Sequence, residues 1–317
     1  MRNLLFLAIA LFIGSASAQT YPAKAIRIIV PFTPGSATDV MGRIVGERLN
    51  AAWGQPVVVD NKPGAGGSIG IREGSRADPD GYTLVLVSSG HAVNHVLYKD
   101  LGYDTLKDLS AVAMLGSLPS VLIVPPTLPV NSVKELVAML QANPGKYNYA
   151  TAGVGSGAHV SLEKFNVATG VKAVHVPLKG TPPILAETMA GRVEYAMVPA
   201  VSGMGPVRDG KVKPLAVSTN KRVAALPNVP TLGEAGFPGA ESTFWLALLA
   251  PAKTPPEIVA KVNAEVNRAL NSPEVVERLA KLGTDPMSMT PAQSDAFIAR
   301  EYNELGKIMR DAGLTPQ

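Results

Sequence analysis

The fold is decided by residues 26–49, which read IRIIVPFTPGSATDVMGRIVGERL. The apolar, β-branched run Ile26–Phe32 predicts a buried strand. The break at Thr33–Gly35 ends that strand, because proline and glycine interrupt regular structure. Apolar residues then recur every three or four positions from Met41 to Leu49, which predicts an amphipathic helix. A strand, a tight loop and a helix therefore follow one another within a few residues.

The alternation of strand and helix signals continues along the chain and predicts an α/β protein of two lobes, each a mostly parallel sheet flanked by helices. A proline-rich passage, Pro119–Pro129, interrupts the pattern and is interpreted as the first crossing between lobes. From Thr254 onward the pattern is helical, and these helices need a sheet to cover. We predict that they return to the first lobe. The expected limits are 19–122 with 223–317 for lobe 1, and 123–222 for lobe 2.

The first 18 residues predict a cleaved secretory signal peptide. Arg2 precedes an apolar run from Leu4 to Ile13, and small residues lead to a cleavage site near Ala18. The apolar run is shorter than the roughly 20 residues that span a bilayer, which disfavours a membrane anchor. We expect the mature protein in the periplasm, without insertion into the membrane.

The composition excludes several classes of protein. The chain has no cysteine, which rules out a lipid-modified cysteine, disulfides, thiolate metal sites and thiol catalysis. The net charge of +4 is far below the basic surplus of nucleic-acid-binding proteins. Aromatic residues make up 5% of the chain, too few to predict base-stacking platforms. We expect no nucleic-acid partner.

Two loops that join a strand to a helix carry the functional prediction. They are Pro34–Asp39, where Ser36 and Asp39 have the spacing of a capping box, and the glycine loop Gly153–Gly157. Helix N-termini present unpaired N–H groups and the positive end of the dipole, and glycine lets a ligand approach the backbone. Ligands of open α/β sheets lie beyond the carboxyl ends of strands, where both loops are expected. The simpler alternative is that the glycines only permit tight turns.

The candidate ligand-binding residues come from these loops and from nearby strand ends. His91 is placed as a hydrogen-bond donor at a strand end. His159, in the first turn of its helix, could face a ligand or cap its own backbone. Lys179 is the cation at another strand end, with a solvated surface lysine as the alternative. The predicted binding residues are Phe32, Pro34, Gly35, Ser36, Ala37, Thr38, Asp39, Ser88, Ser89, His91, Thr151, Gly155, Ser156, His159 and Lys179.

One motif raises an enzymatic alternative. Gly66–Gly70 matches the G-x-S-x-G elbow of serine hydrolases, with Ser68 in the place of the nucleophile. Eight residues separate Ser68 from the strand residue Val59, too many for the sharp turn that exposes such a serine. We predict that the protein is not an enzyme.

Two other motifs raise a cofactor and a metal. Gly153–Ala158 matches the dinucleotide fingerprint, but the next strand ends in Pro177–Lys179 without the acidic residue that binds ribose. His91 and His95 stand four apart, as zinc ligands on a helix would, yet a zinc site needs three or four ligands. We expect no cofactor and no metal.

Many short motifs occur in the order that is typical of one family. They are VPFTPGSATD (30–39), NKPGAGG (61–67), PDGYTL (79–84), YNYA (147–150), HVP (175–177), KG (179–180) and LPNVPT (226–231). With these motifs the chain, from Tyr21 to Gly313, resembles the substrate-binding receptors of tripartite tricarboxylate transporters, also called Bug-type solute receptors.

The resemblance implies a two-lobed, hinge-closing periplasmic binding protein (type II-like). Such a receptor holds a small organic acid largely through backbone N–H groups and passes it to the permease subunits of the transporter. The jaws would be Phe32–Asp39 and Gly153–His159, with no cofactor or metal. We expect a monomer. The alternatives are a binding protein of an ATP-driven transporter or a ligand-sensing receptor, and more remotely a serine hydrolase.

The chain departs from the family pattern at several positions of the expected site. Thr33 and Ser36 stand where a second proline and a second glycine are usual, and Leu178 replaces a common tyrosine. Val198 and Pro199 stand where an aspartate and an asparagine are frequent. Loss of these polar partners predicts a less polar carboxylate ligand, such as an aromatic acid or a longer aliphatic diacid.

Overall fold

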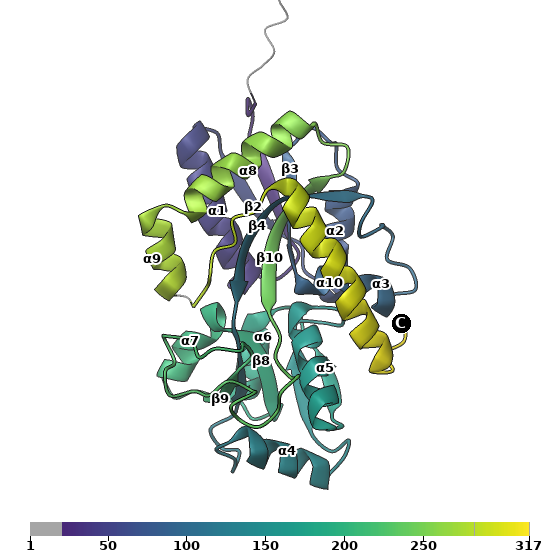
Figure 1. Cartoon of the computed structure of the whole chain (residues 1–317), viewed down its shortest axis with the longest axis vertical. Helices are drawn as coiled ribbons and strands as arrows, with labels where there is room; N and C mark the ends of the chain where they lie inside the picture. The colour runs from purple at the N-terminus through teal and green to yellow at the C-terminus, as the bar shows by residue number, and fades with distance from the viewer. Residues whose placement is uncertain (1–20, 282, 317) are drawn as a thin grey trace, which may run out of the picture.

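The structure is a computed structural model that describes residues 21–281 and 283–316, so the predicted signal peptide, 1–18, lies outside the described residues. In the described part, two five-stranded sheets form separate lobes, one above the other in Figure 1. The predicted α/β fold of two lobes is confirmed. No helix in these two ranges is long and apolar enough to span a membrane.

The sheet of the first lobe has the spatial order β2-β1-β3-β10-β4. Strands β1, β2 and β3 run parallel, whereas β10 runs antiparallel to both of its neighbours, β3 and β4. The strands are β1 (Ile26–Val30), β2 (Val57–Asn61), β3 (Thr83–Ser88), β4 (Leu109–Leu118) and β10 (Phe244–Pro251).

The sheet of the second lobe has the matching order β7-β6-β8-β5-β9, with β5 antiparallel to β8 and β9. Its strands are β5 (Ser120–Val124), β6 (Asn148–Thr151), β7 (Val174–Pro177), β8 (Tyr195–Pro199) and β9 (Lys213–Val217). In each described sheet, the antiparallel strand is fourth in the row and is the first strand formed after the chain crosses from the other lobe.

Helices cover both faces of the first sheet. Alternate strand residues point to opposite faces, so each strand contributes side chains to both cores. Leu84 and Leu86 of β3 face one core, with α1 (Ala37–Trp53), α8 (Pro256–Leu270) and α9 (Pro273–Lys281). Val85 and Val87 face the other, with α2 (Ser68–Ser75) and α10 (Pro291–Asp311). Helices α8, α9 and α10 therefore all pack on the sheet of the first lobe (Figure 1). Three short helices lie near the end of β3 or before α2, namely η1 (Ala65–Gly67), η2 (Ser89–Ala92) and α3 (Asn94–Leu97).

The second sheet is covered in the same way. Leu122 and Val124 of β5 face the core beneath α4 (Val133–Ala142) and α5 (Gly157–Thr169). Val121 and Ile123 face the core beneath α6 (Thr181–Met189) and α7 (Ala200–Arg208). Helices α5, α6 and α7 all begin at the edge of the sheet that faces the first lobe (Figure 1).

The limits of the second lobe stay a prediction, and we propose that they move outward to 120 and 242. Ser120 already pairs with Pro199 in the second sheet, three residues before the predicted start at 123. Val229 and Ala240 pack in the cores of the second lobe, well beyond the predicted end at 222. Hydrophobic burial assigns residues 223–242 to the second lobe, even though this segment carries no regular strand or helix.

Removal of side-chain volume from the central strand β3 should destabilise the protein. Leu86→Ala leaves a cavity between β3 and α1, and we expect it to lower the free energy of unfolding by about 3 kcal/mol. Val58→Ala on β2 is the matched control, because Val58 is 53% exposed; its effect should stay within about 0.5 kcal/mol. Urea unfolding followed by circular dichroism measures both. Equal effects of the two variants would contradict this packing.

Candidate ligand-binding site

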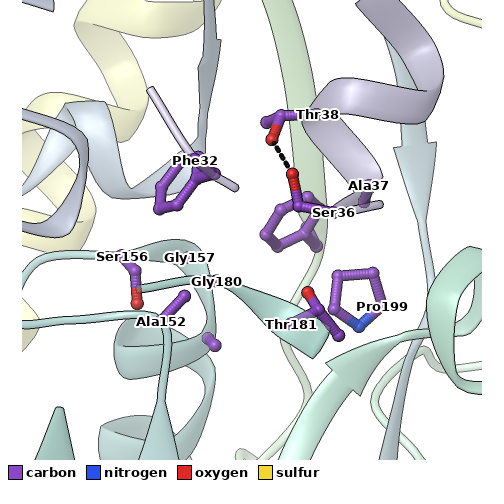
Figure 2. Close-up of a pocket in the computed structure, with 12 residues that line it drawn as sticks. Phe32, Ser36, Ala37, Thr38, Ala152, Ser156, Gly157, Gly180, Thr181 and Pro199 are labelled. Carbon is purple, nitrogen blue, oxygen red and sulfur yellow. Dashed lines mark hydrogen bonds between the residues drawn. The ribbon is translucent and has the colours of Figure 1, made fainter. Parts of the chain in front are cut away.

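A cavity lies between the two lobes and is lined by both. Figure 2 shows the loop before α1 above the cavity and the loops before α5 and α6 below it. Among the described residues, no charged side chain lines it. The lining residues are Phe32, Ser36, Ala37, Thr38 and Phe244 from the first lobe, and Ala152, Ser156, Gly157, Ala158, Gly180, Thr181 and Pro199 from the second.

Helices α1 and α5 point their N-termini at this cavity from opposite sides. The N–H groups of a first helical turn have no partner within the helix. Ala37 and Thr38 begin α1, Gly157 and Ala158 begin α5, and all four residues line the cavity. The arrangement offers backbone donors to an anion from both lobes.

Helices α6 and α7 add two more N-termini. Their N-cap residues are Gly180 and Pro199, neither of which caps the helix with a side chain, and both line the cavity. Each helix N-terminus is equivalent to about half a positive charge. Four of them supply about two positive charges, which suits one or two carboxylates and needs no lysine or arginine.

The first jaw is held in shape by a reciprocal pair of hydrogen bonds. The Ser36 hydroxyl accepts from the N–H of Asp39 (3.3 Å), and the Asp39 carboxylate accepts from the N–H of Gly35 (2.9 Å). Arg43 and Asn61 also donate to that carboxylate. Burial opposes ionisation, but the hydrogen bonds outweigh it and lower the pKa of Asp39. Asp39 therefore shapes the loop instead of facing the cavity.

The second jaw has the same construction with a different acceptor. The Ser156 hydroxyl accepts from the N–H of His159 (3.2 Å), and the Nδ1 atom of His159 accepts from the N–H of Gly155 (3.2 Å). Burial, followed by the neighbouring His175, lowers the pKa of His159 to about 3. The ring is therefore neutral and can accept this hydrogen bond at neutral pH.

The two lobes are closed on each other, and backbone atoms make the closest approaches. A Cβ atom on Gly66 would lie 1.8 Å from the carbonyl oxygen of Val154, and one on Gly90 would lie 2.1 Å from that of Gly155. Tyr98 also donates from its hydroxyl to the Val154 carbonyl (2.7 Å). Glycine is needed at such contacts because any side chain would hold the lobes apart.

Of the predicted binding residues, the structure brings five to the cavity, namely Phe32, Ser36, Ala37, Thr38 and Ser156. Pro34, Gly35, Asp39, Gly155 and His159 lie in the two jaw loops without lining it. Ser88 and Ser89 are buried at the end of β3. The Thr151 hydroxyl is hydrogen-bonded to His175 (2.6 Å), and Lys179 contacts the first lobe through its carbonyl, which accepts from the N–H of Thr33 (3.4 Å).

The structure does not bring His91 to the interlobe cavity. The chain leaves β3 through the 3₁₀ helix η2, and this turn directs the His91 ring into the first lobe, where it stacks on Tyr103. His91 lines a separate cavity there. The expected donor role beside Ser88 and Ser89 therefore has no support from the geometry.

Several lining residues were absent from the predicted set: Ala152, Gly157, Ala158, Gly180, Thr181, Pro199 and Phe244. The start of α6 was recognisable from Thr181 followed by proline, and its place after a strand end could have marked it as part of the site. Phe244 carried no such signal, since it arrives with the antiparallel strand β10 from a distant part of the sequence.

The serines of the hydrolase alternative lack an activating base. The Ser156 hydroxyl caps α5 by accepting from the N–H of His159, and Ser68 begins α2. Within residues 21–281 and 283–316, neither hydroxyl is hydrogen-bonded to a histidine ring, and no group of three or more His, Asp or Glu side chains is arranged to hold a metal ion.

Comparison with known proteins identifies the family. The family model described as tripartite tricarboxylate transporter family receptor matches residues 41–314. The chain belongs to this family. The protein BugT of Bordetella pertussis is 39% identical over 98% of this chain and 95% of its own length.

Solved structures agree with this membership. The periplasmic binding protein BugD is 31% identical, with a TM-score of 0.90 over 94% of this chain and 100% of that one. Rpa4515 of R. palustris, solved with adipate, is 32% identical, with the same TM-score and the same coverage of both chains. The receptor fold of the family is therefore the fold of this chain.

A methyl group at Gly90 should prevent closure without harming either lobe. The atoms that a Cβ at Gly90 would meet all belong to the second lobe, and the backbone of Gly90 has no positive φ. We expect Gly90→Ala to fold normally but to bind adipate, used as a probe, at least about tenfold more weakly, because binding energy depends on closing both jaws. Titration calorimetry measures the affinity.

The matched control is Gly205→Ala, because a Cβ at this position in α7 meets no atom within 4 Å. It should leave affinity unchanged. Unaltered binding by Gly90→Ala, or an equal loss in both variants, would show that closure does not require this contact.

Replacement of Asp39 should remove a pH-dependent part of the stability. We expect Asp39→Asn to lower the free energy of unfolding by about 2 kcal/mol at pH 7, since it loses charge-assisted hydrogen bonds. The lowered native pKa means that this stabilisation is complete above the unfolded pKa of about 4 and is lost as the pH falls below it. Urea unfolding of wild type and variant between pH 3 and 8 should therefore show curves that converge in acid. A constant difference would contradict the role of the carboxylate.

Proposed function

We propose that the protein is a periplasmic receptor that captures a small carboxylate in the interlobe cavity and delivers it to the permease subunits of a tripartite transporter. The convergence of the N-termini of α1, α5, α6 and α7 on one cavity carries this proposal. The predicted signal peptide supports export, and family membership favours this transporter class over an ATP-driven one.

The walls of the cavity favour a ligand with an apolar middle. The rings of Phe32 and Phe244 and the side chain of Pro199 line it, together with alanines of both lobes. The polar side chains there are the hydroxyls of serine and threonine, which are neutral. A linear diacid can place its carboxylates at helix N-termini on both sides and its methylene groups against the rings, where apolar burial stabilises them. The adipate in the related R. palustris structure is an acid of this kind.

The same geometry supports a binding role without catalysis. The two jaw serines cap their helices and so offer no activated nucleophile, and the cavity walls supply no acid or base among the described residues. General acid–base catalysis requires a titratable group within hydrogen-bond reach of the reacting atoms. A receptor needs only the donors, the rings and the hinge, and we expect it to act as a monomer.

The proposal is tested by titration calorimetry of the mature chain with adipate, malate, citrate, benzoate and glutamate. We expect adipate or benzoate to bind at least about tenfold more tightly than malate or citrate, because an added hydroxyl or third carboxylate loses its hydration in a cavity whose walls are largely apolar and uncharged. Preferential binding of citrate or glutamate would contradict the apolar preference. Failure of every acid to bind the folded protein would contradict the proposal that the protein is a carboxylate receptor.

Pro199 should contribute to this preference. Pro199→Asn introduces a polar side chain into the cavity at an N-cap position that asparagine favours. We expect the preference for adipate over malate to fall by about tenfold, the effect of one hydrogen bond to the malate hydroxyl. Pro144→Asn, in an exposed loop of the second lobe, is the matched control. An unchanged preference in Pro199→Asn would remove this residue from the determinants of specificity.

A further inference from the structure

A second cavity lies in the first lobe, and we call it the His91 cavity. It is bounded by η2, the segment that leads into β4, strand β10 and the first half of α10. Its polar side chains include His91, Thr105 and Asp295, and its apolar wall includes Leu109, Leu249 and Ile298. None of these side chains lines the interlobe cavity. Leu109, Leu249 and Ile298 also belong to the core between the first sheet and α10.

Two polar side chains of this cavity are buried without a partner. His91 is 2% exposed and Thr105 is 4% exposed. Neither ring nitrogen of His91, nor the hydroxyl of Thr105, makes a hydrogen bond of good geometry among the described residues, although the Thr105 backbone lies close enough to the ring to favour its protonated form. Buried polar groups in proteins are nearly always hydrogen-bonded, to protein, to water or to a ligand. The two side chains face one space, which indicates an occupant that they share.

The His91 ring is held in a fixed orientation by stacking on Tyr103, with ring centroids 6.0 Å apart and an angle of 9° between the planes. Burial lowers the pKa of His91 to about 4. At neutral pH the ring is therefore uncharged, and it offers one N–H donor and one acceptor. A group that both donates and accepts, such as a hydroxyl, satisfies this ring best.

Asp295 provides a negative charge in the same cavity. Its Oδ1 atom accepts from the N–H of Ala111 (2.7 Å). Among the described residues, no lysine, arginine or histidine forms an ion pair with it within 4.0 Å, and partial burial raises its pKa. A cation in the cavity would offset the cost of this desolvation. Asp295 also disfavours a second carboxylate here.

We propose that the His91 cavity is a second ligand site, which binds a small primary ammonium compound that carries a hydroxyl group. Asp295 accepts from the ammonium group, His91 and Thr105 hydrogen-bond the hydroxyl, and Leu109 and Ile298 cover the carbon chain. A metal ion fits less well, because the described residues around the cavity do not include three metal-ligating side chains. The site does not depend on the function proposed for the interlobe cavity.

Titration calorimetry of the mature chain with ethanolamine tests the site, with ethylene glycol as the matched neutral compound. We expect saturable binding of ethanolamine and none of ethylene glycol. Asp295→Asn keeps the shape and an oxygen for the Ala111 N–H, and should weaken ethanolamine binding at least about tenfold. Thr105→Val keeps the volume and should weaken it severalfold. Asp311→Asn, which removes an exposed carboxylate from the same helix, should leave binding unchanged.

Binding of adipate to each variant should equal that of the wild type, which separates a failure of this site from a failure of the interlobe site. The proposal is overturned if ethanolamine does not bind, if ethylene glycol binds equally well, or if Asp295→Asn binds ethanolamine like the wild type. A crystal soaked in ethanolamine that shows ordered water alone beside His91 and Asp295 would overturn it as well.

Discussion

The structure depends on the backbone N–H groups at the start of helices, which have no partner within the helix. At each jaw, a serine hydroxyl satisfies one of these groups, and a second side chain fixes the glycine before the serine. The remaining N–H groups of the first turn lie at the cavity, without a partner in the helix. This explains why the site contains glycine, serine and threonine but no charged lining residue among those described: the helix termini already supply the positive potential.

The two lobes carry these capped helix N-termini at equivalent positions. Their sheets have the same strand order, so β1 with α1 in the first lobe corresponds to β6 with α5 in the second. Asp39 and His159 occupy the same position relative to their jaws and accept the same backbone hydrogen bond. One acceptor is an anion stabilised by Arg43, and the other is a buried neutral ring. The shared requirement is geometric, an acceptor four residues after the glycine, and it can be met by different chemistry.

Much of this was predictable because it is local in sequence. The period of apolar residues predicted the strands and helices, and the loops at 34–39 and 153–157 predicted the jaws. Contacts made over long sequence separations were not predictable in this way. Phe244 reaches the cavity on β10, and the segment around Val229 joins the second lobe by burial without regular structure. His91 stands beside the site in sequence, but the turn of η2 directs it elsewhere, and no residue type or spacing reveals that rotation.

The positions of the antiparallel strands in the sequence constrain the order in which the two sheets can form. The second sheet is complete once β9 has been made, because all its strands lie between Ser120 and Val217. The first sheet starts earlier but lacks the strand between β3 and β4 until β10 emerges at Phe244. As the chain is synthesised, the lobe that begins second is therefore the first that can close its sheet. Until then, the edges of β3 and β4 stay unpaired, and such edges are prone to aggregation. An export route that keeps the chain unfolded until synthesis ends would avoid this hazard.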